Sequence, residues 1–214
     1  MIQIERWSEP DHLTQNRPKW LAAFLKRRAT NPKARPPSRQ YGHEKIRTIL
    51  HRMSGGKCFY CERKLQNVAK HVEHYIDVAL NPNKAFDWNN LYFSCEKCNL
   101  EKASEKACPI ADCIDPCGDV DPKRHLTFSR EFIRPLNDSQ LGRNTIQKYK
   151  LDRDELDHMR LRELINFYER LESFRRRNHP LTKSQKERLR SYMQRESAFS
   201  LMFQVYLQDH VDLD

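Results

Sequence analysis

The chain has 214 residues, with 39 basic and 29 acidic side chains and a formal net charge of +10. This length can bury one hydrophobic core with an appendage. The sequence shows no apolar run suited to a signal peptide and no stretch of membrane-spanning length, which argues against the secreted and membrane classes and predicts a soluble cytoplasmic protein.

The positive excess lies mainly in residues 1–50, which carry 11 basic and 4 acidic side chains. We expect one helix over residues 18–26, with Pro18 in its first turn, and a second over residues 43–53. Between them, basic residues surround several prolines. This segment is either a basic arm that lies along a phosphate backbone or a solvated linker. The arginines predicted to contact nucleic acid are Arg27, Arg28, Arg35 and Arg39.

Two Cys-x-x-Cys knuckles follow, and they are the strongest signal in the chain. Each knuckle places two thiolates on one side of a tight turn, and two knuckles complete the tetrahedral sulfur shell that Zn²⁺ prefers. The alternatives are four unrelated buried cysteines or two disulfides, but the duplicated spacing and the lack of a secretory segment favour structural zinc. The predicted zinc ligands are Cys58, Cys61, Cys95 and Cys98.

The 33 residues between Cys61 and Cys95 exceed the insert of a simple zinc ribbon, so we expect them to hold the chemistry. Residues 58–76 suit a β-hairpin, residues 88–94 a further extended piece, and a helix is expected from Cys98 onward. The order is therefore β–β–α with zinc at its base.

Motif residues occur at Glu73-His74, Asn90-Leu91 and Cys98-Asn99-x-x-Lys102. This combination resembles the HNH endonuclease family, which has a ββα-metal fold. The resemblance implies that His74 is the general base and that Asn90 anchors the connecting loop. It also implies that Glu73 and Asn99 are ligands of a catalytic Mg²⁺ or Mn²⁺, and it adds Lys102 to the residues expected to contact nucleic acid.

The chemistry of phosphodiester hydrolysis fits these residue types. The reaction needs a deprotonated water and a cation that neutralises charge on the phosphate. A neutral His74 can take the proton, while the oxygens of Glu73 and Asn99 suit a hard cation. Taken singly, a histidine is more often a surface or core residue, and an asparagine after a cysteine is usually a helix cap. Their joint order favours an active site.

A narrower resemblance covers about residues 40–160 and is to the HNH subunits of Septu-type and retron-linked anti-phage systems. It implies an ABC-type ATPase as partner and, in retron versions, a reverse transcriptase with its RNA–DNA product. Its motifs are Cys58-x-x-Cys61, Val72-Glu73-His74, Asp87-Trp88-x-Asn90-Leu91, Cys95-x-x-Cys98-Asn99, Ile114-Asp115-Pro116, Asp121-Pro122 and His125-Leu126-x-Phe128, followed by Thr145-Ile146 and residues 151–156.

The sequence departs from that group after His74. The group usually has a Pro-Lys pair there, whereas this chain has Tyr75 and Ile76, so a basic phosphate contact is missing or moved. Asp77 is either an additional carboxylate near the metal or a surface residue at the strand end. Cys108, Cys113, Cys117 and His125 form a second zinc site or are reduced thiols with an unrelated histidine.

Residues 151–214 are expected to form a helical hairpin. His179-Pro180 breaks the helical pattern, and Thr182-x-x-Gln185 resembles a capping box for the second helix. The hairpin buries its apolar face on the nuclease unit or docks it on a partner, with the aromatic-rich end at residues 199–206 as the candidate contact. The apolar positions are Leu156, Leu161, Leu164, Ile165, Tyr168, Leu171 and Phe174 on the first helix, and Leu189, Tyr192, Met193, Phe199, Met202, Phe203 and Tyr206 on the second.

The expected fold is α+β, with a small zinc-clipped ββα-metal core at residues 55–150. A helical basic segment (1–54) precedes this core and a helical interaction region (151–214) follows it. Two functions compete: a metal-dependent endonuclease, or a zinc-clipped nucleic-acid-binding adaptor without catalysis. The pair Glu73-His74 together with Asn99 favours the enzyme, because binding alone does not require these residues.

Overall fold

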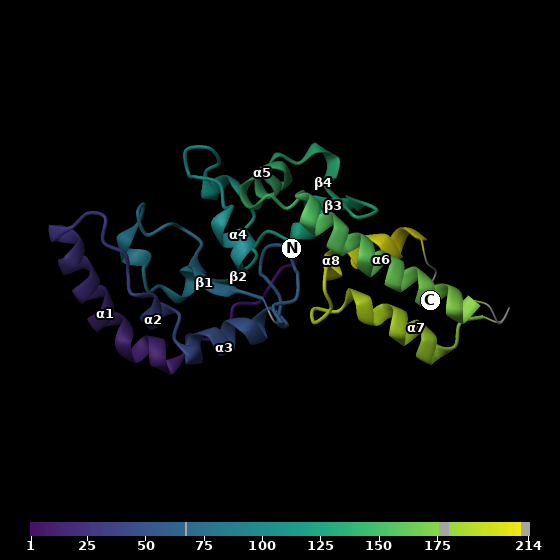
Figure 1. Ribbon diagram of the computed structural model, residues 1–214, viewed down its shortest axis with the longest axis horizontal. Helices are drawn as coiled ribbons and strands as arrows, with labels where there is room; N and C mark the ends of the chain where they lie inside the picture. The colour runs from purple at the N-terminus through teal and green to yellow at the C-terminus, as the bar shows by residue number, and fades with distance from the viewer. Residues whose placement is uncertain (67, 176–179, 211–214) are drawn as a thin grey trace.

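A computed structural model describes residues 1–66, 68–175 and 180–210, with the side chains of 207–210 excepted. The molecule is α+β (Figure 1). Its helices are α1 (Asp11–Thr30), α2 (Ser38–Tyr41), α3 (Glu44–Met53), α4 (Glu96–Leu100), α5 (Gln140–Tyr149), α6 (Asp154–Arg175), α7 (Lys183–Arg190) and α8 (Ser200–His210). Its strands are β1 (Lys70–His74), β2 (Leu91–Cys95), β3 (Leu126–Ser129) and β4 (Phe132–Pro135). Short 3-10 helices occur at Pro82–Lys84, Trp88–Asn90, Ile110–Asp112, Pro122–Arg124, Leu136–Asp138 and Ser191–Met193.

Helix α1 is longer than the helix expected over residues 18–26. It starts at Asp11, whose carboxylate favours a helix N-terminus, so Pro18 lies inside the helix instead of in its first turn. The first turns of α1 are polar and bury only Leu13, which is why no apolar periodicity indicated them. Helix α3 matches the second expected helix, with His43 as its N-cap.

Strands β1 and β2 pair antiparallel, and α4 follows β2 directly, so the β–β–α order is confirmed. The expected hairpin within residues 58–76 is wrong: the described part of that stretch contains one bridge, between Lys57 and Lys64, and then β1. The knuckle turn occupies the intervening residues and puts Glu62 at φ +62°, which breaks an extended ladder. The partner of β1 comes instead from beyond the insert.

A second antiparallel pair, β3 with β4, lies between the ββα unit and the C-terminal helices (Figure 1). A two-residue turn joins its strands, and its first residue, Arg130, has φ +57°. Helix α5 packs against β4. Neither this pair nor α5 was expected from the sequence, because the strands have only four residues each.

The described part of the C-terminal region has three α-helices where two helices were expected. The second expected helix is interrupted by the 3-10 turn at Ser191–Met193 and by Phe199, whose φ of +51° is incompatible with a continuous helix. The Thr182 capping box is confirmed. His179 of the expected break lies outside the described residues.

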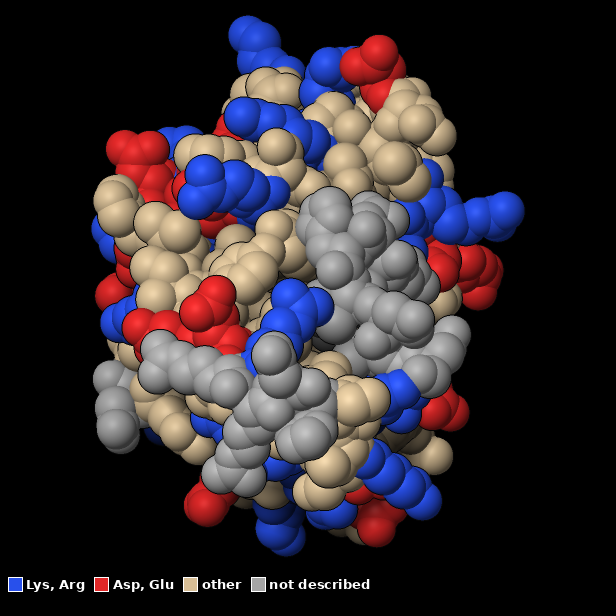
Figure 2. Space-filling model, turned by 90° about the vertical axis from the view of Figure 1, so that its right-hand side faces the viewer, with Lys and Arg blue, Asp and Glu red and all other residues tan. Residues whose placement is uncertain are grey.

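The apolar face of α6 is narrower than expected. Ile165 and Tyr168 are 48% and 39% exposed, while Phe167 is buried among aromatic rings. Phe199, Met202 and Phe203 are buried, so the aromatic-rich end at 199–206 is largely internal, and α8 packs on β3. Of the two expected alternatives, the structure therefore shows packing of this end against the preceding part of the chain. Seen from the side on which the C-terminal helices lie, the molecule carries acidic and basic side chains interspersed on its surface (Figure 2).

The buried apolar residues form one connected cluster from Met1 to Phe203. Within it, Lys57 Nζ donates to Glu62 Oε2 at 3.0 Å and to Ser200 Oγ at 2.8 Å, so the first knuckle is bonded to the start of α8. Among the described helices, none has the length and apolar character needed to cross a membrane.

Candidate active site and zinc centre

Strand β1 ends at His74, and the fold fixes the tautomer of its ring. His74 Nε2 lies 2.9 Å from the carbonyl oxygen of Ala85. A carbonyl can only accept a hydrogen bond, so Nε2 carries the proton and Nδ1 keeps a free lone pair. Burial lowers the pKa of His74 to about 4, and the ring lies 4.6 Å from that of Tyr41. At neutral pH the imidazole is therefore uncharged and able to accept a proton at Nδ1.

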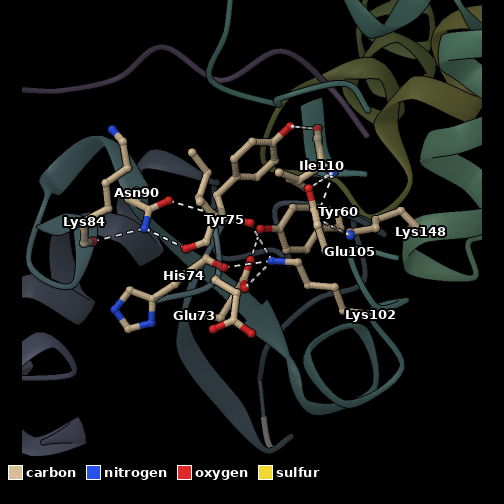
Figure 3. A network of polar contacts seen from close by, with 12 residues as sticks. Tyr60, Glu73, His74, Tyr75, Lys84, Asn90, Lys102, Glu105, Ile110 and Lys148 are labelled. Atoms are coloured by element: carbon tan, nitrogen blue, oxygen red, sulfur yellow. Dashed lines mark hydrogen bonds and ion pairs between the residues drawn. The ribbon is translucent and has the colours of Figure 1, made fainter. Parts of the chain in front are cut away.

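Asn90 holds the loop that connects β1 to β2. Its side chain is buried, with Oδ1 accepting from the N–H of Ile76 at 2.7 Å. Its Nδ2 donates to the carbonyls of Ile76 and Lys84, both at 3.0 Å (Figure 3). Asn90 thus bonds Ile76, near the start of the loop, and Lys84, which directly precedes Ala85, the residue that orients His74.

Glu73 points into a polar network (Figure 3). It is only 6% exposed; Tyr60 OH donates to its Oε1, and Lys102 Nζ donates to its Oε2 at 3.0 Å. Burial raises the pKa of Glu73, and the Lys102 ammonium opposes that rise. The carboxylate is consequently held in one orientation.

Lys102 is turned inward. Besides Glu73, its Nζ donates to the carbonyls of His74 at 2.7 Å and Tyr75 at 2.8 Å. An ammonium group has three donor hydrogens, and these three acceptors occupy them. In this conformation Lys102 fixes the end of β1 and offers no further proton donor to a substrate.

Glu73, His74 and Asn99 line one cavity of about 400 Å³. His71, on β1, also lines this cavity. Among the described residues, no hydrogen bond involves the side chain of His71 or that of Asn99, which lies on α4. Strand alternation places His71 and Glu73 on the same face of β1. The cavity therefore combines an oriented carboxylate, an imidazole with a free lone pair and two unengaged polar groups.

The donor set suits a hard divalent cation. The carboxylate oxygens of Glu73 and the amide oxygen of Asn99 are the ligand types that Mg²⁺ and Mn²⁺ bind, and a shell with few protein ligands leaves positions for water and phosphate. The unengaged amide of Asn99 beside the buried carboxylate is the observation that fits a metal here. The catalytic Mg²⁺ or Mn²⁺ expected from the sequence would be held by these two residues.

The basic N-terminal segment is folded against this region, not extended as an arm. Arg28 donates to the carbonyls of Ala34 and Ala79, the latter in the loop after β1. Arg35 lines the cavity and forms an ion pair of 2.8 Å with Asp77. Asp77 is thus at the rim of the cavity with a basic partner.

The other two predicted arginines do not line the cavity. Arg27 donates to the carbonyl of Arg35, and Arg39 lies on the short helix α2. Of the basic residues expected to contact nucleic acid, only Lys102 and Arg35 line the cavity.

The four knuckle cysteines form a zinc site. Cys58, Cys61, Cys95 and Cys98 are buried, and their sulfur atoms lie within 4.8 Å of one another. The Cys61 and Cys95 sulfurs are 3.8 Å apart, which matches the roughly 3.8 Å edge of a tetrahedron with Zn–S bonds of about 2.3 Å. Burial raises the pKa of the Cys58 thiol well above its usual value, so four thiolates require a cation among them.

The structure does not bring the remaining cysteines together with His125. Cys108 and Cys113 have sulfurs 3.7 Å apart, while His125 Nδ1 bonds Ser139 Oγ. Among the described residues, the knuckle cysteines are the one group of three or more potential metal ligands, and Cys117 lies outside it.

Sequence reasoning missed three residues of the site: Tyr60, Tyr41 and His71. Tyr60 lies between the first two cysteines and stacks on Tyr149 at 3.9 Å, a long-range contact that spacing does not reveal. His71 could have been found from strand alternation, two positions before Glu73. Tyr41 gives no sequence signal.

Comparison with known proteins finds similar sequences over part of the chain. Residues 58–105 match the HNH endonuclease family. The chain is 32% identical over 130 residues to the Septu protein PtuB of Bacillus thuringiensis, covering 59% of this chain and 46% of that protein. It is 29% identical over 202 residues to the Septu protein PtuB of Bacillus mycoides (strain KBAB4), covering 75% and 66%. Residues 58–105 are therefore similar to the HNH endonuclease family, within a chain that is similar to Septu proteins.

Proposed function

We propose that this chain is a metal-dependent endonuclease that hydrolyses phosphodiester bonds of nucleic acids in the cytoplasm. The single observation that supports it most strongly is the Nε2–H···O=C bond between His74 and Ala85, because it leaves Nδ1 unprotonated on a residue that lines the same cavity as Glu73 and Asn99. A histidine that serves only packing does not need to share a cavity with potential metal ligands.

In the proposed reaction, His74 Nδ1 removes a proton from the attacking water, and the Ala85 carbonyl stabilises the imidazolium that forms. Asn90 keeps the loop that carries Ala85 in place. A cation bound by Glu73 and Asn99 would neutralise charge that develops on the phosphate. Lys102 and Tyr60 orient Glu73 for that role.

Substrate binding would involve the cavity rim. Arg35 is exposed there, and an arginine can contact a phosphate through two parallel hydrogen bonds once it leaves Asp77. Arg28, Arg27 and Arg39 extend the basic surface along α1 and α2. These contacts would go to the backbone of the nucleic acid, so they carry no base specificity.

The similarity to Septu proteins supports a role as the effector subunit of an anti-phage defence complex. The partner would be an ABC-type ATPase and, in a retron-type system, a reverse transcriptase with its RNA–DNA product. The chain aligns with 46% and 66% of its two curated relatives, so these partners are part of the proposal.

The test is cleavage of plasmid, single-stranded DNA and total tRNA in Mg²⁺, Mn²⁺ or EDTA, with and without the proposed ATPase partner. Glu73→Gln and Asn99→Ala should each lose activity and bind Mn²⁺ more weakly by calorimetry, whereas Glu169→Gln, on the exposed face of α6, should behave as the parent. Nucleic-acid binding without metal-dependent cleavage of any substrate under all conditions would favour the non-catalytic adaptor.

A further inference from the structure

Arg153 lies outside the matched domain, directly before α6, and its guanidinium contacts the zinc cluster. Its Nη1 and Nη2 atoms lie 3.7 and 3.6 Å from Cys98 Sγ. The same Nη1 donates to the carbonyls of Tyr149 at 3.2 Å and Lys150 at 3.0 Å, at the end of α5. The side chain is 11% exposed. The guanidinium is thus fixed between the C-terminus of α5 and one ligand of the cluster.

The negative charge expected for a zinc-bound cluster would be stabilised by this contact. Four thiolates around Zn²⁺ leave a net charge of −2 in a buried site, and buried charge is costly unless it is paired and hydrogen-bonded. Among the described residues, no other charged side chain donates to a sulfur of the cluster. A hydrogen bond from a cationic N–H stabilises a thiolate, so the thiolate is protonated less readily.

The contact also extends to the first knuckle. Glu155, in the first turn of α6, forms an ion pair of 2.8 Å with Arg63, two residues after Cys61. Glu155 lies 3.7 Å from Arg153 Nε as well. The start of α6 is therefore connected to both halves of the zinc clip.

We propose that Arg153 is a positioning residue that retains zinc by hydrogen-bonding the Cys98 thiolate and that couples zinc occupancy to the docking of α6. Thermodynamic linkage makes this coupling reciprocal: zinc favours the docked α6, and the docked α6 favours zinc. The inference rests on zinc in the four-cysteine site and is independent of the proposed nuclease activity.

The first experiment follows transfer of zinc from the purified full chain to a chromogenic chelator. Arg153→Gln removes the charge and should weaken zinc affinity by roughly 10- to 100-fold, the range found when residues that bond metal ligands are replaced. Arg153→Lys keeps the charge but lacks the planar fork, so an intermediate effect is expected. Arg162→Gln, on the exposed face of α6, is the matched control and should retain zinc as the parent does.

Two further measurements separate this role from general stabilisation. In the Co²⁺-substituted protein, Arg153→Gln should shift the sulfur-to-metal charge-transfer band, which Arg162→Gln leaves unchanged. Hydrogen exchange of residues 154–160 should rise both in Arg153→Gln and in the parent stripped of zinc.

The proposal is overturned if Arg153→Gln keeps the parental zinc affinity and Co²⁺ spectrum. If Arg153→Gln fails to fold, recovery of folding by excess zinc supports the proposal. Failure that zinc does not reverse, combined with parental zinc affinity in Arg153→Lys, rejects it.

Discussion

The tautomer of the His74 imidazole depends on Ala85 and Asn90, which do not line the cavity. Ala85 sets its tautomer, Asn90 positions Ala85, and burial keeps the ring neutral. Lys102 and Tyr60 do the same for Glu73 by bonding one carboxylate oxygen each. Each side chain proposed to act in catalysis therefore depends on a buried neighbour, and the effect of replacing that neighbour can be anticipated.

Replacing Asn90 with Ala should reduce both stability and cleavage. The change removes three hydrogen bonds and leaves the N–H of Ile76 and the carbonyls of Ile76 and Lys84 without their partner. Buried polar groups that lose their partners cost about 2 to 4 kcal/mol of unfolding free energy in total. Denaturant unfolding measures the loss, and Asn89→Ala, at an exposed neighbouring position, is the control. Equal unfolding curves for the two variants would refute the anchoring role.

The rate of cleavage should not change around the pH at which an ordinary histidine becomes protonated. Burial lowers the pKa of His74 from its usual value to about 4, so the folded protein keeps Nδ1 unprotonated from about pH 5 upward. An unperturbed histidine has a pKa of about 6.5. Single-turnover cleavage rates at saturating metal should therefore show no decline centred near that pH as the pH is lowered. A decline centred there would show that His74 is solvated in the working enzyme.

At the scale of elements, we expect the zinc clip to act together with the hydrophobic core in holding the short elements of the ββα unit in place. Strands β1 and β2 have five residues each, and α4 has five. A two-stranded hairpin and one helical turn are marginal alone. Cys95 ends β2 and caps α4, accepting from the N–H of Cys98, so the metal site joins α4, which carries Asn99, to β2, the strand that pairs with the Glu73 strand β1.

Cys95→Ser should therefore lose zinc and the folded state of the ββα unit. Structural zinc contributes about 10 to 16 kcal/mol in small zinc domains, which is as large as the typical stability of about 5 to 15 kcal/mol of a whole domain. Metal analysis and near-UV circular dichroism test this, with Cys117→Ser, outside the cluster, as control. Retention of one zinc ion per chain by Cys95→Ser would contradict the assignment of the clip.

Local signals predicted much of this arrangement. The two knuckles, the α3 pattern and the Thr182 capping box depend on neighbours within a few residues, and all three hold. The pairing of β1 with β2, separated by the insert, is set by tertiary contacts, so the hairpin was predicted at the wrong place. The inward turn of Lys102 was missed for the same reason, because a lysine at its sequence position reads equally well as a surface cation.

At the scale of the molecule, the C-terminal helices are bonded to the preceding part of the chain and do not form a separate hairpin. Helix α8 packs on β3, Arg153 contacts Cys98, and Glu62 of the first knuckle bonds Ser200 at 2.7 Å. The buried pair of Lys57 with Glu62 lies at this junction. Stability of the zinc clip and of the helical region should therefore change together.

Glu62→Gln should destabilise the whole protein by about 3 to 5 kcal/mol, because it leaves the Lys57 ammonium buried without its counter-charge. Urea unfolding followed separately by aromatic fluorescence and by zinc release should show both transitions moving to lower urea. Glu169→Gln, exposed on α6, should leave both in place. A shift confined to one of the two signals would show that the regions unfold independently.

The central claim is that His74 is the general base of a nuclease. The most direct measurement is single-turnover cleavage by the zinc-loaded His74→Ala variant, compared with the parent and with His158→Ala on the surface of α6. We expect a loss of rate of at least about 100-fold in His74→Ala, with zinc content unchanged. A parental rate in His74→Ala would contradict the assignment of the base.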